Sequence, residues 1–156
     1  MERKPDSRHP LVGLSDELIR LNGRLKSLFA DARRTVGLND SELAVLNAVV
    51  EASRPPTVPQ IGRSFGQPRQ NIQRAANSLI AAGLIEPLDN PDHKRAVLLR
   101  ATGEGVKIKR DLDRRADALA AEIAEPLDER SVAAAAEALR KVRQALEARL
   151  RVREDD

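Results

Sequence analysis

Apolar residues recur at helical spacing along most of this chain. Near the N-terminus they alternate in steps of four and three from Leu14 to Ala32, a heptad-like stripe typical of a helix that packs against another helix. Ser15 and the two acids after it suit the start of such a helix, and Gly37 suits its end. The pattern therefore predicts one long helix over about residues 11–36.

Three shorter apolar stripes follow, each bounded by residues that begin or end helices. Asn39 and Glu42 have the spacing of a capping box, and the prolines of the segment SRPP end the helix that they begin. Thr57 is a candidate N-cap for a short helix that ends at Gly66. Pro68 suits the first helical position of the next helix, which a glycine closes.

The period changes after Gly83. The short apolar runs LIEPL and AVLLR flank the polar, turn-rich stretch DNPDHK, which predicts two strands joined by a loop. Pro87 lies in the first run, and a proline within a strand favours a short edge strand. Helical spacing then returns. Thr102 is a candidate cap for a long helix that Pro126 ends, and Asp128 is one for a last helix with a leucine stripe.

The composition favours a helical protein with an aliphatic core. Of the 156 residues 41% are hydrophobic, yet the only aromatic side chains are two phenylalanines, so aliphatic residues must fill the core. There is no cysteine, which excludes disulfides and thiolate zinc sites, and no apolar run approaches the ~20 residues that span a membrane. The polar N-terminus lacks the apolar stretch of a secretory signal. We therefore expect a mobile arm over residues 1–10, His9 included, and a cytoplasmic protein.

The positive charge is concentrated in the middle of the chain. The whole sequence has a formal net charge of +3, whereas the segment 54–100 contains seven basic and three acidic residues. A basic centre between nearly neutral flanks favours binding of a polyanion such as nucleic acid. No paired histidines, P-loop or nucleophile elbow accompany it, so the sequence predicts no metal ion, no cofactor and no catalytic site.

The helix expected after Pro68 has two different faces. Apolar residues at helical spacing form one face, with Ile72, Ala76 and Leu79 as its anchors. The other is rich in side-chain amides and arginine and contains no acid, unlike the mixed Glu and Lys of an ordinary solvated face. In the DNA major groove Gln and Asn pair with adenine, and Arg pairs with guanine. The candidates for base contact are Arg69, Gln70, Asn71 and Gln73, and Arg74 lies further round the helix, where it would reach phosphate.

A helix, a short turn, a polar-faced helix and a hairpin with a basic tip follow the order of a winged helix-turn-helix. In this order the sequence resembles the MarR family of transcriptional regulators, from about Leu14 to Leu150. Four segments carry the resemblance: LNDSELAVLNAV, TVPQIGRSFGQPRQNIQRAANSLIAAGLIE, DNPDHKRAVLLRAT and ATGEG. The resemblance implies a mainly α fold. A winged helix-turn-helix lobe would occupy residues 38–101, and dimerisation helices would occupy residues 11–36 and 102–152.

The resemblance also implies a homodimeric regulator, specifically a repressor, that binds a pseudo-palindromic operator in double-stranded DNA. Lys94 and Arg95 at the wing tip are the candidates for the minor groove, and His93 is one for a phosphate contact or a neutral loop residue. Thr57 and Pro68 stand where helix N-termini would meet phosphate. The family usually has an acid where His93 stands, two positions before the tip arginine, so the sequence leaves open how this wing is held.

The terminal helices carry more apolar surface than the winged lobe can cover. This excess favours a twofold dimer over packing within one chain. The resemblance further implies a small aromatic or phenolic effector between the dimer helices and the DNA-binding lobe, although a filled core without a ligand is an equal alternative. A winged-helix module that docks a protein through the same face is the alternative to DNA reading. The expected walls of the effector pocket are Leu18, Leu21, Asn22, Leu25 and Leu46.

Overall fold

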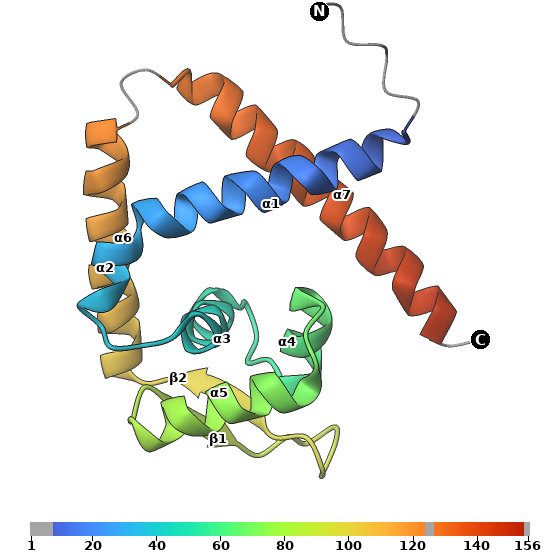
Figure 1. Ribbon diagram of the computed structural model, residues 1–156. Helices are drawn as coiled ribbons and strands as arrows, with labels where there is room; N and C mark the ends of the chain where they lie inside the picture. The colour runs from blue at the N-terminus through green and yellow to red at the C-terminus, as the bar shows by residue number, and fades with distance from the viewer. Residues whose placement is uncertain (1–7, 124–126, 155–156) are drawn as a thin grey trace, which may run out of the picture.

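The computed structural model describes residues 8–123 and 127–154 of the chain, which form seven helices and one hairpin in these ranges. Figure 1 shows a compact winged lobe at one end of the molecule and long helices at the other. The elements, in order, are α1 (Pro10–Leu28), α2 (Ala30–Arg34), α3 (Asp40–Glu51), α4 (Val58–Phe65), α5 (Arg69–Ala81), β1 (Ile85–Leu88), β2 (Leu98–Ala101), α6 (Gly103–Ile123) and α7 (Glu129–Glu154).

The core of the winged lobe lies between α3, α4, α5 and the hairpin. It is aliphatic, as the composition predicts, because neither phenylalanine is fully buried. The helical periodicity of α5 accounts for four of its members, which point away from the polar face of that helix. The core residues are Val45, Leu46, Val49, Val58, Ile61, Ile72, Ala75, Ala76, Leu79, Leu84, Ile85 and Leu99.

The hairpin is antiparallel, with Ile85 opposite Ala101 and Leu88 opposite Leu98. A third segment extends it, because Thr57 forms an isolated antiparallel bridge with Leu98 and the segment before α4 pairs along β2. This leaves β1 at the edge, where the missing N–H of Pro87 breaks no ladder. The predicted short edge strand is confirmed.

The predicted caps are confirmed at four helices. Asn39 and Glu42 form a reciprocal capping box at α3, and Thr57 forms another with Gln60 at α4. The Thr102 hydroxyl accepts the Gly105 N–H at 3.1 Å to cap α6, and Asp128 accepts two N–H groups of the first turn of α7. These local signals explain why the helix starts between residues 39 and 128 agree closely with the sequence pattern.

The single N-terminal helix expected over residues 11–36 is wrong in two respects. The helix begins earlier, at Pro10, and His9 is its N-cap, with Nδ1 accepting the Leu11 N–H at 3.2 Å. His9 is therefore ordered, and Ser15 lies inside the helix rather than at its start. The helix also stops at Leu28, where Phe29 is the C-cap and its N–H donates to the Leu25 carbonyl. The short α2 continues after this break, so the heptad spacing concealed a change of direction.

Two further boundaries differ from expectation or lie outside the described residues. Pro68 is the N-cap of α5, in an extended conformation with ψ of 134°, and not its first helical residue. Residues 1–7 of the expected mobile arm and the expected stop at Pro126 lie outside the residues that the structure describes.

The terminal helices are the least covered part of the molecule. No described side chain of α1 or α7 is buried, and their apolar stripes stay largely open to solvent in the single chain. Leu18, Leu21 and Leu25 of α1 and Val132 and Leu146 of α7 are each 39–52% exposed. Isolated leucines on a surface are common, but two continuous stripes on long helices indicate an uncovered packing surface.

Candidate nucleic-acid interface

The turn between α4 and α5 packs closely against the end of α4. Gly66 adopts the left-handed backbone conformation, with φ of 60°, which glycine tolerates without strain. The Gln67 N–H donates to the Gly62 carbonyl at 2.9 Å, and a Cβ on Gly62 would lie only 3.2 Å from the Gln67 carbonyl oxygen. The small residue at Gly62 therefore lets the two helices pack closely and sets the direction in which α5 leaves the turn.

The polar face of α5 carries an ordered set of side-chain hydrogen bonds. Gln73 Nε2 donates to Asn77 Oδ1 at 2.9 Å, and the Arg74 guanidinium donates to Asn71 Oδ1 at 2.8 Å. Asn77, one turn further along α5, thus orients the Gln73 amide. The sequence pattern did not predict this role for Asn77. Arg69 and Gln70, at the N-terminal end, are exposed. The structure thus brings the five polar residues expected on this helix together on one accessible face.

Thr57 occupies a different position from these residues. Its side chain is buried, with 7% exposed, and its N–H already donates to Gln60 Oε1 at 2.8 Å. The Leu99 N–H donates to the Pro56 carbonyl at 2.8 Å beside it. Thr57 therefore ties the start of α4 to the wing, and its own N–H is occupied.

The wing is held by side-chain hydrogen bonds of Asn90 and His93. Asn90 Nδ2 donates to the Ala96 carbonyl at 2.7 Å, and Asn90 Oδ1 accepts the Asp92 N–H at 3.1 Å. His93 Nδ1 accepts the Arg95 N–H at 3.4 Å. No ion pair joins Asp92 to Arg95 within this fully described loop. The hydrogen bonds of Asn90 and His93 therefore shape the wing tip, although His93 stands where an acid is usual.

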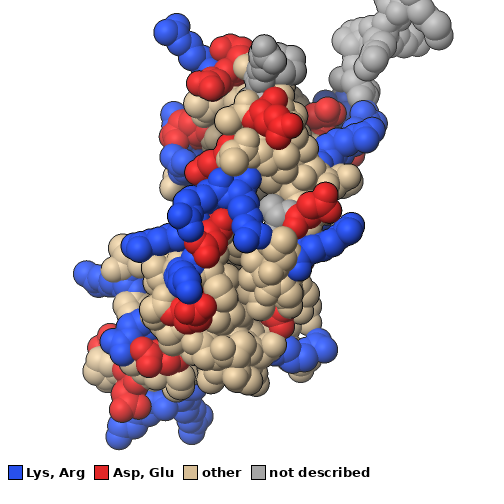
Figure 2. Space-filling model, turned by 90° about the vertical axis from the view of Figure 1, so that its left-hand side faces the viewer, with Lys and Arg blue, Asp and Glu red and all other residues tan. Residues whose placement is uncertain are grey.

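The basic residues of the winged lobe are mostly uncompensated. Between residues 54 and 100, all of which are described, the one ion pair joins Arg100 to Glu86 across the hairpin at 2.8 Å. Figure 2 shows Lys and Arg side chains projecting from the lower end of the molecule, which α5 and the wing form, with acidic side chains beside and above them. The remaining bases of the lobe have no acidic partner in the described structure: Arg54, Arg63, Arg69, Arg74, Lys94 and Arg95.

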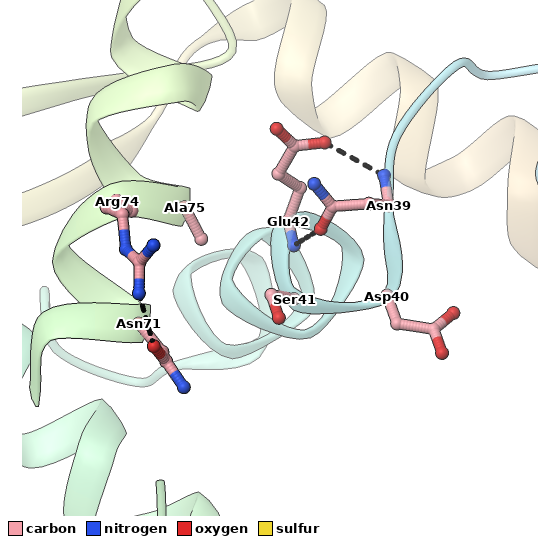
Figure 3. Close-up of a pocket in the computed structure, with 7 residues that line it drawn as sticks. All are labelled: Asn39, Asp40, Ser41, Glu42, Asn71, Arg74 and Ala75. Carbon is pink, nitrogen blue, oxygen red and sulfur yellow. Dashed lines mark hydrogen bonds between the residues drawn. The ribbon is translucent and has the colours of Figure 1, made fainter. Parts of the chain in front are cut away.

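An open groove of about 720 Å³ runs between the first turn of α3 and one edge of α5. Figure 3 shows Arg74 and Asn71 on the α5 side, with Ala75 pointing toward α3 and the Asn39–Glu42 capping box opposite. Most of the lining residues have polar side chains, Ala75 being the exception, and acids line the α3 side. The groove therefore separates the basic face of α5 from an acidic helix start.

The backbones of the wing and α6 pack closely where the two elements meet. The Thr102 hydroxyl donates to the Gly83 carbonyl at 2.7 Å, and the Thr102 N–H donates to the Leu84 carbonyl at 3.0 Å. A Cβ on Gly105 would collide with that Leu84 carbonyl. The glycine in ATGEG was a motif of the sequence resemblance, but only the structure shows the close approach that requires it.

Lys109 links α6 to the end of α3. Its side chain is 12% exposed, and Nζ lies 3.3 Å from Glu51 Oε1 and 2.5 Å from Asp113 Oδ1. Burial disfavours the charged ammonium, but the hydrogen bonds and charges of Asp113 and Glu51 outweigh it and raise the Lys109 pKa above 10.5. The ammonium therefore stays charged at neutral pH and bridges the two parts of the molecule.

The residues expected to line an effector pocket are not brought together in the single chain. Leu46 is fully buried in the core of the winged lobe, whereas Leu18, Leu21, Asn22 and Leu25 are exposed on α1.

Neither a metal site nor a membrane-spanning helix is found in the described part of the chain. In residues 8–123 and 127–154 no group of three His, Asp or Glu side chains is placed to hold a metal ion. No helix in the same ranges is long and apolar enough to cross a membrane.

Comparisons with known proteins agree with this geometry. A sequence model of the MarR family matches residues 36–96, which span α3 to the wing. An uncharacterised protein of Mycobacterium tuberculosis is 32% identical over 142 residues, which cover 86% of this chain and 98% of that protein.

Two solved structures share the fold over most of the chain. A mutant MarR from E. coli in complex with operator DNA has a TM-score of 0.68 and 21% identity, over 88% of this chain and 98% of that chain. CouR from Rhodococcus jostii RHA1, bound to p-coumaroyl-CoA, has a TM-score of 0.70 and 21% identity, over 83% of this chain and 91% of that chain.

Proposed function

The chain belongs to the MarR family of transcriptional regulators, and from this premise we propose that it is a homodimeric repressor that reads a pseudo-palindromic operator in double-stranded DNA. One observation carries the proposal: α5, with its exposed amides and uncompensated bases, lies at the same end of the lobe as the basic wing (Figure 1). Such a surface attracts phosphate and offers the donors and acceptors that base edges require.

In this proposal α5 enters the major groove from its N-terminal end. Arg69 would contact guanine, and Gln70, Asn71 and Gln73 would contact adenine, each good bidentate pair contributing roughly 1–3 kcal/mol of discrimination. Arg74 lies beside the groove of Figure 3 and would hold phosphate.

The wing and the helix starts position the lobe on the backbone. Arg95, with Lys94, would enter the minor groove, and His93 would contact phosphate or shape the loop. Pro68 stands at the start of α5 and would lie next to the phosphate backbone of the DNA. Thr57 would contribute by holding α4 against the wing, since its N–H is already bonded to Gln60.

The uncovered helices support the dimer. The open leucine stripes of α1 and α7 need a partner, and a second copy supplies the same stripes by twofold symmetry. A twofold dimer would place two copies of α5 about one helical turn of DNA, roughly 34 Å, apart. The operator would then consist of two inverted half-sites.

An effector is a further part of the proposal. CouR binds p-coumaroyl-CoA, and by analogy a small aromatic or phenolic compound would release this chain from DNA. Leu18, Leu21, Asn22 and Leu25 would line the site from α1, and Leu46 would form the core beneath it. We place the protein in the cytoplasm, as a binding protein rather than an enzyme.

Binding-site selection tests the proposal. Purified protein would be mixed with a library of random duplexes, and the bound fraction would be sequenced after several rounds. We expect an enriched inverted repeat. Retardation of duplexes without enrichment would contradict sequence reading, and the absence of any retardation at low salt would favour a module that docks protein.

A further inference from the structure

Glu42 uses both carboxylate oxygens to join segments that lie far apart in the sequence. Oε2 accepts the Asn39 N–H at 2.8 Å and completes the capping box of α3 (Figure 3). Oε1 accepts the hydroxyl of Ser78, on α5, at 2.6 Å. A capping box needs only the first bond, so the second connects the start of α3 to the base-reading helix.

The second bond supplies a direction that the apolar packing lacks. The buried side chains of α5 are Ile72, Ala75, Ala76 and Leu79, and the hydrophobic effect that holds them is non-directional. A hydroxyl bonded to a carboxylate has a preferred geometry and is stronger than a neutral pair. Ser78 lies one and two turns after Arg74 and Asn71 on the same edge of α5. Its bond therefore restricts rotation of α5 about its own axis.

The same turn of α3 also receives a contact from α1. Lys26, in the last turn of α1, places Nζ 2.7 Å from Asp40 Oδ2 in the first turn of α3. Asp40 and Glu42 are two residues apart, so one helical turn is tied to α1 on one side and to α5 on the other.

We propose that the first turn of α3 is a positioning element for operator recognition. Glu42 is its positioning residue: it fixes the rotation of α5 through Ser78, and Asp40 links that rotation to α1 through Lys26. The proposal rests on the proposed function, because it concerns how accurately α5 is presented to base edges.

Ser78→Ala tests the link to α5. The substitution removes one hydroxyl, leaves the capping box intact and replaces serine with a better helix former, so the variant should fold. Fluorescence anisotropy would give the affinity for the selected operator and for a random duplex, and thermal unfolding would give Tm. We expect the preference for the operator to fall roughly threefold to tenfold, with the random-duplex affinity and Tm unchanged.

Ser41→Ala is the matched control, because Ser41 lies in the same groove, on α3, and has no side-chain hydrogen bond in the described structure. Glu42→Gln is the conservative variant. Its amide can accept the Asn39 N–H and donate to the Ser78 oxygen, so it should keep most of the preference.

The outcomes separate the possibilities. An unchanged preference in Ser78→Ala overturns the positioning role, and a parallel loss of both affinities together with Tm assigns Ser78 a structural role only. A wild-type chain with no preference overturns the proposed function itself. The link to α1 is tested by combining Lys26→Ala with Ser78→Ala: we expect non-additive effects on the preference, and additive effects overturn that link.

Discussion

Gly105→Ala perturbs the junction where α6 leaves the wing. The new methyl group would meet the Leu84 carbonyl, which belongs to the backbone and accepts the Thr102 N–H, so it cannot rotate away as a side chain would. Overpacking costs about 1–3 kcal/mol, and a rigid obstacle places this site near the upper end. Against this cost, alanine stabilises a helix by about 1 kcal/mol relative to glycine. The net loss of about 2 kcal/mol corresponds to a Tm lower by roughly 4–8 °C for a chain of this size.

Gly103→Ala is the control for this experiment, because a Cβ there would meet nothing within 4 Å. It makes the same chemical change two residues earlier in the same helix, and its Tm should equal or exceed that of the wild type. Both variants would be unfolded thermally at one protein concentration, since association contributes to apparent stability. A Gly105→Ala protein at least as stable as Gly103→Ala would refute the close approach of α6 to Leu84.

Three other predictions concern charge and base contact. Arg95→Ala should weaken binding to all duplexes and reduce the slope of log affinity against log salt by about one, whereas Lys107→Ala, on α6, should leave the slope unchanged. Gln70→Ala should relax base preference at one position of each half-site, and an identical selected sequence would remove Gln70 from the reading set. The raised Lys109 pKa predicts that its ion pairs stabilise the fold below pH 10.5 and are lost as pH rises through the folded-state value. The urea midpoint of wild type should therefore fall more steeply above pH 10.5 than that of Lys109→Met, and parallel curves would contradict the bridge.

Local signals made much of the winged lobe predictable. The starts of α3 and α4 are capped by short-range hydrogen bonds of Asn39 with Glu42 and of Thr57. Because the residues of a capping box lie three positions apart, the sequence alone predicts such helix starts. The apolar period of α5 likewise separates Ile72 and Leu79 from the amides of the polar face. These features depend on residues within two turns of one another.

Long-range contacts account for what the sequence did not reveal. The bond between Ser78 and Glu42 spans 36 residues, and the approach of Gly105 to Leu84 depends on how two elements cross. The break after Leu28 was hidden because the apolar spacing continues through it to Ala32. Thr57 shows a related limit: its capping role was visible, but its burial under the wing was not.

The spacing of the operator half-sites tests the central claim most directly. Once an inverted repeat has been selected, five base pairs would be inserted at its centre, which turns one half-site to the opposite side of the duplex without changing any contacted base. A dimer that reads both half-sites with two copies of α5 and two wings predicts that affinity falls toward that of a random duplex, and that inserting ten base pairs recovers part of it. Equal affinity for the native and the five-base-pair spacing would contradict a rigid twofold reader.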